Sequence, residues 1–440
     1  MSAILDGIQR TLEAHALVHD WTLQETHQDS TQLYLIGAEP EAVRLAHTAR
    51  YDITIYRDHD GERGQASASL QAGDLSQLDA RLDEAAFLAG MSHNPPYTLP
   101  RPAASYPDVE SWEAAIGTPE QAARVAATLA QEVREALHGE ADVRLSSMEL
   151  FLEAADITLR TSTGVAAHRR GTHGECELVV TSRSSDGQES EAQDLWQRRR
   201  AADLRVGERA HRQAQYARDA LRTRLPDNGQ FLVVLPAETM LPFFDAVTYR
   251  SAAGVKYRQG TPWEAGQPIA APPAPGSFDR LDITSDATLP FGVETRAFDG
   301  QGLPARRYPL IQDGVLARFW ATQRYADYMQ LEATGEPANM VLAEGTRSAD
   351  DLLTPPDDRP LIYVVTFSWL NPDEITGDFV GEIRLGYQIT RDGWQPIKGG
   401  TVSGNVFTAL TQAHFSRETA FEGNYEGPRL SRFHGLTVAG

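Results

Sequence analysis

The sequence is poor in cysteine, which excludes two ways of stabilising a protein. Its 440 residues contain one cysteine, Cys176. A single thiol can form neither an intramolecular disulfide nor a cysteine-rich zinc module. Such sparing use of cysteine is typical of a reducing compartment, and we expect a cytoplasmic protein.

Long apolar runs are also missing. No stretch of about 18 consecutive apolar residues occurs, so we expect no transmembrane helix and no membrane partner. Asp6, Arg10 and Glu13 interrupt the apolar residues at the start of the chain. This pattern predicts that the chain carries no signal peptide.

Basic residues are too few to balance the acidic ones. The chain has 40 Lys and Arg against 61 Asp and Glu, which gives a formal net charge of −21. A surface of this charge repels phosphate backbones, so we expect no direct binding to nucleic acid. The charge suits a soluble protein that meets neutral or basic peptides.

Familiar catalytic motifs are missing as well. A metallopeptidase needs two histidines one helical turn apart and a carboxylate that activates the metal-bound water. None of the 12 histidines is followed by glutamate, so neither HExxH nor HExxxH occurs. The chain has no GxSxG nucleophile motif and no P-loop.

Two looser groups of metal-binding residue types remain. His15 and His19 are four residues apart on the first expected helix, where exposed surface histidines are the favoured interpretation. His168, His173 and Cys176 lie in a β-rich stretch, and strand alternation would send their side chains to two faces. A hairpin with one buried thiol is therefore favoured over a zinc site.

Two further patterns have simple structural explanations. Residues 300–305 match the GxGxxA pattern of dinucleotide-binding loops, but a proline and an expected hairpin follow where a helix is required. We interpret them as a tight turn. The three arginines 198–200 fall on an expected helix, where a solvated face is favoured over a partner site.

Hydrophobic periodicity predicts an α+β fold in two domains, 1–224 and 225–440. The first is expected to be a helix-flanked α/β domain, and the break at Leu225–Gly229 sets the boundary. Its expected strands are 32–36, 51–57, 66–70 and those within 143–183. Its expected helices are 4–16, 75–88 with Asp74 as N-cap, 118–137 with Thr118 as N-cap, and 195–221. The proline-rich segment 94–107 is expected to cross the domain in extended form.

The second domain is expected to be sheet-rich and barrel-like. It opens with a strand at 231–235 and a helix at 238–251, followed by a loop at 262–275. Asp313-Gly314 and Asp392-Gly393 sit between strand-like runs and predict two hairpins.

Segments along nearly the whole chain resemble, in order and spacing, the motifs of the TldD/PmbA family. These are GQASASL (64–70), 88–97, RTSTGV (160–165), 229–235, FDGQGLP (298–304), LIQDGVLARF (310–319), TGDF (376–379), GYQI (386–389), PIK (396–398), VSGN (402–405) and LTVAG (436–440). Family members were first described as modulators of DNA gyrase and later as peptidases. The resemblance implies a heterodimer that degrades unfolded peptides and trims leader sequences.

In this family one subunit type, TldD, carries HExxxH after the opening strand of the second domain, has a late cysteine and binds zinc. Counted from that strand here, Asp245, Ala246 and Arg250 fall where His, Glu and His would stand. Alanine cannot activate water, arginine repels a cation, and 424–433 contains no cysteine. The resemblance therefore implies the other type, TldE/PmbA, with no catalytic or metal-binding residue in this chain and zinc in a TldD-like partner.

The resemblance also implies a closed chamber in which an extended peptide pairs with strand edges. The residues that it marks as turn or chamber candidates are Asp299, Gly300, Gly302, Gly377, Asp378, Phe379, Lys398, Gly404 and Asn405. Gln301 and Val380 depart from the family motifs and indicate a divergent member.

Two alternatives stay open. The chain could be a stand-alone homodimeric binding or regulatory protein without proteolytic activity, and a gyrase-related role belongs here. It could also be an enzyme with a site around His168, His173 and Cys176.

Overall fold

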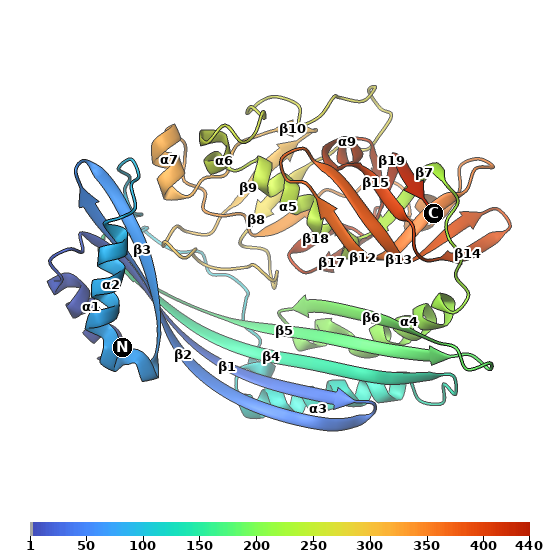
Figure 1. Ribbon diagram of the computed structural model, residues 1–440, viewed down its shortest axis with the longest axis horizontal. Coiled ribbons are helices and arrows are strands. Elements are labelled where there is room, and N and C mark those ends of the chain that lie inside the picture. The colour runs from blue at the N-terminus through green and yellow to red at the C-terminus, as the bar shows by residue number, and fades with distance from the viewer. Residues whose placement is uncertain (1–2) are drawn as a thin grey trace.

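The computed structural model describes residues 3–440, whose strands form three sheets (Figure 1). The first sheet has the order β3-β2-β1-β4-β5-β6, and each neighbouring pair is antiparallel. Its strands are β1 (Asp20–Ile36), β2 (Glu39–His59), β3 (Glu62–Gln71), β4 (Val143–Thr161), β5 (Ala166–Arg183) and β6 (Glu189–Arg198). In Figure 1 they form one long curved band beneath the second half of the chain.

Helices cover one face of this sheet. α1 (Ala3–Ala14) and α2 (Leu78–Ala89) pack on β1 to β3, and α3 (Pro119–Ala136) and α4 (Val206–Ala220) pack on β1 and β4 to β6. Leu23 and Leu33 of β1 are buried under different helix pairs, yet they share one face because side chains alternate along a strand.

The opposite face, which we call the open face, turns toward the second half of the chain (Figure 1). By the same alternation it presents the even-numbered residues of β1 and the odd-numbered residues of β4 and β5. Part of it is covered by a buried cluster that joins Leu159 of β4 to Ala297 and Phe298 of the second half.

The second half contains a closed barrel of five strands. Its ring order is β12-β7-β19-β15-β13, and a β12–β13 pairing closes it. The strands are β7 (Gly229–Pro236), β12 (Leu361–Pro372), β13 (Asp378–Thr390), β15 (Thr401–Asn405) and β19 (Leu430–Ala439), with β14 (Gly393–Ile397) paired outside β13 and β16 (Ala413–Phe415) on β19. A large buried core joins this ring to α5 (Leu241–Arg250). The expected α+β fold with a barrel-like second half is confirmed.

A third sheet of six short strands stands beside the barrel in the order β10-β9-β8-β11-β18-β17. The strands are β8 (Ile283–Asp286), β9 (Arg307–Gln312), β10 (Val315–Leu316), β11 (Asn339–Leu342), β17 (Thr419–Glu422) and β18 (Tyr425–Pro428). The short helices of this half are α6 (Ala253–Tyr257), α7 (Gln323–Met329), α8 (Ala349–Leu353) and α9 (Val406–Thr411).

The proline-rich segment 94–107 is extended, as expected, and connects the two halves. Thr98 donates to Asp327 of α7 through both its backbone N–H, at 2.6 Å, and its hydroxyl, at 2.8 Å. Tyr328 of α7 donates to the carbonyl of Pro95 at 2.6 Å.

The helix expected over 195–221 is wrong in its first third. Residues up to Arg198 belong to β6, a short 3₁₀ turn follows, and α4 begins only at Val206. Ala192 and Trp196 are buried four residues apart, a spacing that fits one face of a helix and also one face of a strand. Arg205 then has a φ of 46°, in the left-handed region, so a continuous helix cannot run through it.

Smaller differences concern element ends. Asp74 is not an N-cap; it is the third residue of a 3₁₀ helix (Ala72–Gln77), and its carboxylate accepts from the N–H of Gln71, the N-cap, at 3.0 Å. The strand after the Asp313-Gly314 turn has only two residues, Val315–Leu316. The strands of the first sheet are longer than expected. Polar residues occupy the open face, and they hide the alternating apolar pattern by which strands are recognised in a sequence.

The predicted boundary after residue 224 stays a prediction. It falls between the last strand of the first sheet and β7. Among residues 3–440, no helix has both the length and the apolar character required to cross a membrane.

Candidate functional site

Helix α5 occupies the position at which the family resemblance expects a metal motif. It starts after β7, and Pro242 stands in its first turn, where a proline removes no helical hydrogen bond. Asp245 is exposed, Ala246 is fully buried and Arg250 is 6% exposed. The three positions therefore include one partly exposed carboxylate and one buried cation.

The guanidinium of Arg250 lies in a mostly apolar environment. It is 5.0 Å from the ring centre of Phe407 and 5.7 Å from that of Trp263, and it donates to the carbonyl of Ile375. Burial lowers its pKa, and Asp373 partly opposes this effect. Burial, with Glu374 nearby, raises the pKa of Asp245. A positive charge at Arg250 opposes binding of a divalent cation here.

Several residues marked by the resemblance gather beside α5. The side chain of Asn405 caps α9 by accepting from the N–H groups of Phe407 at 3.2 Å and Thr408 at 3.3 Å. Its amide also donates to Asp378 at 3.0 Å. Gly377 has a φ of +80°, and a Cβ there would stand 2.4 Å from the Phe407 ring, so only glycine fits.

Phe379 and Gly404 belong to the same region. They are cross-strand partners on β13 and β15, and the Phe379 ring centre is 4.8 Å from that of Phe243 on α5. A Cβ on Gly404 would stand 2.4 Å from Leu436. The structure thus brings Gly377, Asp378, Phe379, Gly404 and Asn405 together, where they support α5 and α9.

The remaining marked residues lie elsewhere. Lys398 has an exposed side chain and follows Ile397, whose partner on β13 is Gly386. Gly386 is eight residues along β13 from Asp378, which corresponds to about 26 Å at 3.3 Å per residue.

Asp299, Gly300 and Gly302 form the tight turn that was expected at 300–305, and this turn docks on the first sheet. Asp299 accepts from the N–H groups of Gln301 and Leu303, both at 2.9 Å, and burial raises its pKa. Gly302 has a φ of +91°, and a Cβ there would stand 2.9 Å from Val165.

The structure does not assemble a zinc site from His168, His173 and Cys176. The ring of His168 contacts Asp156 at 2.7 Å on the surface, whereas Cys176 is fully buried in the core under α3 and α4. His173 lies on the open face, and burial lowers its pKa. Five residues of strand, about 16 Å, separate the two histidines, and they point to opposite faces.

His15 and His19 do not form a helical pair, because α1 ends at Ala14. His15 contacts Asp83 at 3.0 Å with a side chain only 15% exposed, and His19 accepts from the N–H of Asp58 at 3.2 Å. The expectation that both are surface residues is therefore wrong for His15.

The arginine run 198–200 is neither helical nor mainly solvated. Arg199 is largely buried and donates to the carbonyls of Gly292 at 2.8 Å, Val293 at 2.6 Å and Thr295 at 2.8 Å. Burial lowers its pKa to about 10. Arg198 pairs with Glu422 at 3.1 Å, so this run ties β6 to the second half.

A cavity of about 770 Å³ lies between β6 and α4 on one side and the second half on the other. β6 and β17 are edge strands of their sheets, and both contribute to its walls. Its lining is charged and includes Arg198, Arg209, Arg212, Glu238 and Glu422. Burial raises the pKa of Glu422, although Arg209 and Arg198 oppose this effect.

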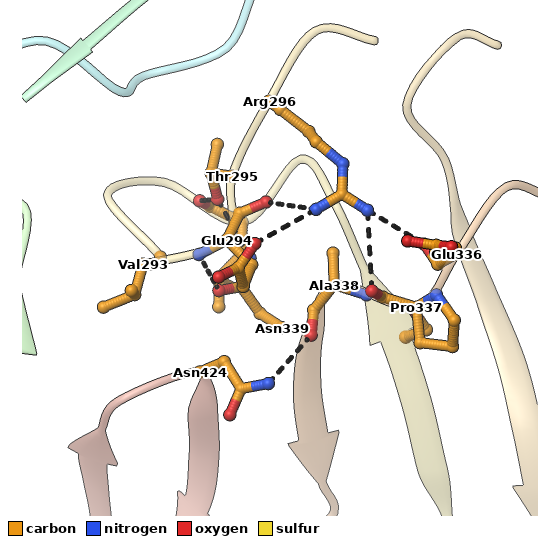
Figure 2. A network of polar contacts seen from close by, with 12 residues as sticks. Val293, Glu294, Thr295, Arg296, Glu336, Pro337, Ala338, Asn339 and Asn424 are labelled. Carbon is orange, nitrogen blue, oxygen red and sulfur yellow. Dashed lines mark hydrogen bonds and ion pairs between the residues drawn. The ribbon is translucent and has the colours of Figure 1, made fainter. Parts of the chain in front are cut away.

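A smaller cavity of about 140 Å³ opens between the open face and the loop before β9. Arg169, Arg199 and Arg296 line it. Figure 2 shows Arg296 donating to backbone oxygens of Glu294 and Pro337, and to that of Glu336 at 3.0 Å. Burial lowers the pKa of Arg169 to about 10, and the charges of Arg296 and Arg199 add to this effect. The cavity wall is therefore positively charged.

Apart from these arginines, the open face is polar and partly acidic. A ladder of side chains runs along β1, in which Tyr34 donates to Gln32 at 3.1 Å, Gln32 to Ser30 at 3.3 Å, and Ser30 to Glu153 of β4 at 3.3 Å. Glu149 of β4 and Glu177 of β5 are direct cross-strand partners. This face offers acceptors for the backbone and the basic groups of a ligand.

Residues 228–440 match the family model described as the PmbA/TldA metallopeptidase C-terminal domain. This match assigns the second half of the chain to the TldD/PmbA family.

Solved structures extend the likeness in fold to the first half. TldE from Thermococcus kodakarensis superposes with a TM-score of 0.82 at 16% identity, over 100% of both chains. TM0727 from Thermotoga maritima superposes with a TM-score of 0.79 at 16% identity, over 99% of this chain and 100% of its own. BT3649 from Bacteroides thetaiotaomicron gives 0.81 at 16% identity, over 99% and 98%. The last two carry the name modulator of DNA gyrase.

A curated relative matches a shorter stretch. The uncharacterized protein MJ0231 of Methanocaldococcus jannaschii is 27% identical over 147 residues, which are 31% of this chain and 34% of that protein. The match therefore spans about a third of its length.

Sequence reasoning missed both cavities and the ties between the halves. Arg209 and Glu422 are in direct contact although 213 residues separate them. The run Arg198–Arg200 was the sequence signal that could have indicated these ties. Arginines at the end of a strand can donate hydrogen bonds to buried carbonyl groups as well as to solvent.

Proposed function

We propose that this chain is a non-catalytic, TldE/PmbA-like subunit of a two-chain zinc peptidase. The observation that carries the proposal is α5, where Ala246 and the buried Arg250 stand at the positions that the resemblance assigns to Glu and His. The chain would shape the chamber and hold the substrate. A TldD-like partner would supply the zinc and the catalytic groups.

The open face supports unfolded peptide as the ligand. Its polar ladder and its facing glutamates suit an extended chain with neutral or basic side chains. The edge strands β6 and β17 beside the cavity of about 770 Å³ offer unpaired backbone groups to such a chain. The net charge of −21 argues against direct contact with DNA.

The alternative is a homodimeric binding or regulatory protein without proteolytic activity. The name that two relatives carry, modulator of DNA gyrase, favours keeping it. The cytoplasmic location stays a prediction.

Mild affinity purification of the tagged chain from its own host separates these proposals. We expect a near-equimolar partner that carries HExxxH and a late cysteine, and chelator-sensitive peptide cleavage that requires this partner. A chain that elutes only with itself would favour the homodimer. Chelator-sensitive cleavage by the chain alone would overturn both proposals.

A further inference from the structure

His59, Glu62 and His93 come together at the tip of the hairpin formed by β2 and β3. Each residue offers one ligand atom, and the three atoms lie within 4.8 Å of one another. Around zinc, with bonds near 2.1 Å, tetrahedral ligands stand about 3.4 Å apart. Small side-chain rotations would therefore suffice to bring all three atoms to one ion.

The fold fixes the first two residues on one face. His59 and Glu62 are direct cross-strand partners. Asp60 and Gly61 form the turn between them, with φ values of 50° and 81°, as a two-residue hairpin requires. The imidazole and the carboxylate consequently project side by side from the same end of the sheet.

His93 reaches this face because its segment is held against β3. The N–H of Arg63 donates to the carbonyl of Asn94 at 2.8 Å, and the Asn94 amide donates to the Arg63 carbonyl at 3.0 Å. At Gly64 a Cβ would stand 1.7 Å from the carbonyl oxygen of Ala89. Only glycine allows this approach, so the backbone fixes His93 over the hairpin.

The chemistry of the three groups matches a metal site. Nε2 of His59 is buried without a hydrogen-bond partner, which is costly for an imidazole unless a ligand engages it. The His59 and His93 rings meet edge to face with centroids 5.0 Å apart, and Nδ1 of His93 is 2.6 Å from Oε2 of Glu62. Two imidazoles and a carboxylate form a donor set that binds zinc and leaves a fourth position for water.

We propose that His59, Glu62 and His93 form a binding site for a divalent transition-metal ion, with zinc as the favoured ion. The site lies in the first half of the chain, whereas α5 belongs to the second, so the proposal does not depend on the peptidase assignment. The nearest cation on β3, Arg63, is paired with the carboxylates of both Asp58 and Asp20.

A metal here would fasten the hairpin to the start of the crossing segment. Asn94, next to His93, accepts from the guanidinium of Arg324 on α7, and Pro95 accepts from Tyr328. The ion would thus stabilise the contact between the first sheet and the second half.

Zinc titration of the full-length chain, after chelator treatment and dialysis, tests the site by calorimetry and by thermal unfolding. We expect one zinc per chain and a raised melting temperature. His93→Ala and Glu62→Gln each change an exposed side chain, so both should fold, as circular dichroism can verify. Each should weaken zinc binding at least about tenfold, because each loses a direct ligand.

His47→Ala is the matched control, because this exposed histidine also faces a carboxylate, Asp29 at 2.7 Å, outside the cluster. It should bind zinc as the parent does. Cobalt provides a second readout, since tetrahedral ligation gives intense visible absorption that both ligand variants should lose. Equal zinc affinity in the parent and both ligand variants, or no binding by the parent, would overturn the proposal. Co-purification with a partner bears only on the proposed function.

Discussion

In the first half of the chain, six long strands form an open sheet with helices on one face, whereas in the second half five strands close into a barrel. The closed barrel surrounds an apolar core that includes α5. The open sheet keeps one polar face with a hydrogen-bonded ladder. We therefore expect stability to come mainly from the barrel, and we propose that ligand contact falls mainly on the open face.

This difference also explains why α5 can be present without metal-binding residues. α5 contributes Phe243, Phe244, Ala246 and Val247 to the barrel core. The barrel core needs these apolar side chains whether or not the helix carries catalytic residues. The second half can therefore keep the family fold without a zinc ligand set on α5.

The largest expected effect concerns the barrel. Phe243→Ala should lower the free energy of unfolding by about 3–5 kcal/mol, because Phe243 is fully buried and contacts the rings of Phe379 and Phe433. Urea denaturation measures it. Phe87→Ala, at a side chain 61% exposed on α2, should cost less than about 0.5 kcal/mol. Equal losses in the two variants would contradict the assignment of stability to the barrel.

A smaller effect is expected where the halves meet. Arg199→Met keeps a long side chain but leaves four backbone carbonyl groups without their donor. We expect a loss of about 2–3 kcal/mol in the free energy of unfolding. Arg81→Ala, which removes an exposed pair with Glu84, is the control and should change it by less than about 0.5 kcal/mol. A loss as small as the control's would mean that water replaces the hydrogen bonds of Arg199 at little cost.

The barrel should also carry an acid-sensitive step at His434. Burial, with the charges of His414, Arg432 and Arg347 nearby, lowers the pKa of His434 to about 4. The unfolded chain binds this proton near pH 6.5. Because the unfolded state binds more protons between these values, stability falls as the pH drops from 6.5 to 4.

His434→Phe removes the titrating group and keeps a ring against Phe278, whose centroid is 4.9 Å away. The ring of His434 is half-buried, so we discount the full shift for solvent screening and expect the acid-induced loss to shrink by about 1–2 kcal/mol. Urea unfolding at pH 7 and at pH 4.5 measures it. An unchanged pH dependence would show that the histidine does not titrate as proposed.

The smallest effect, of opposite sign, belongs to the open face. Glu149→Gln should raise the free energy of unfolding by about 0.3 kcal/mol at low salt, because it removes a like charge directly opposite Glu177. High salt should abolish the gain. Glu84→Gln, which breaks the pair with Arg81, should lower stability by a similar amount.

Local signals in the sequence predicted local structure well. Thr118 caps α3 by accepting from the N–H of Gln121 at 3.4 Å, as expected from Thr-Pro at a helix start. The Asp392-Gly393 turn joins β13 to β14 as expected. Both outcomes depend on residues within four positions of one another, so no tertiary contact was needed to foresee them.

The errors arose where tertiary contacts decide. Residues 195–198 joined β6 because β5 offered a partner along its whole length. The resemblance named the turn and chamber candidates, but it could not say which of them lie close together in space. The structure shows that Lys398 lies apart from Gly377 and Asn405. His59 and Glu62, by contrast, flank an Asp-Gly hairpin turn that could have placed them face to face.

The contact of the crossing segment with α7 has a consequence for biosynthesis. Asn94 leaves the ribosome 230 residues before its partner Arg324. At about 5–20 residues per second, that interval is roughly 10–45 s. During this time the first sheet and its crossing segment lack the surface that later covers them. Until Arg324 is made, the nascent chain exposes an edge strand of the first sheet to other chains. The yield of folded protein should therefore depend on chaperone supply and on the speed of translation up to α7. The speed of translation after α7 should matter less.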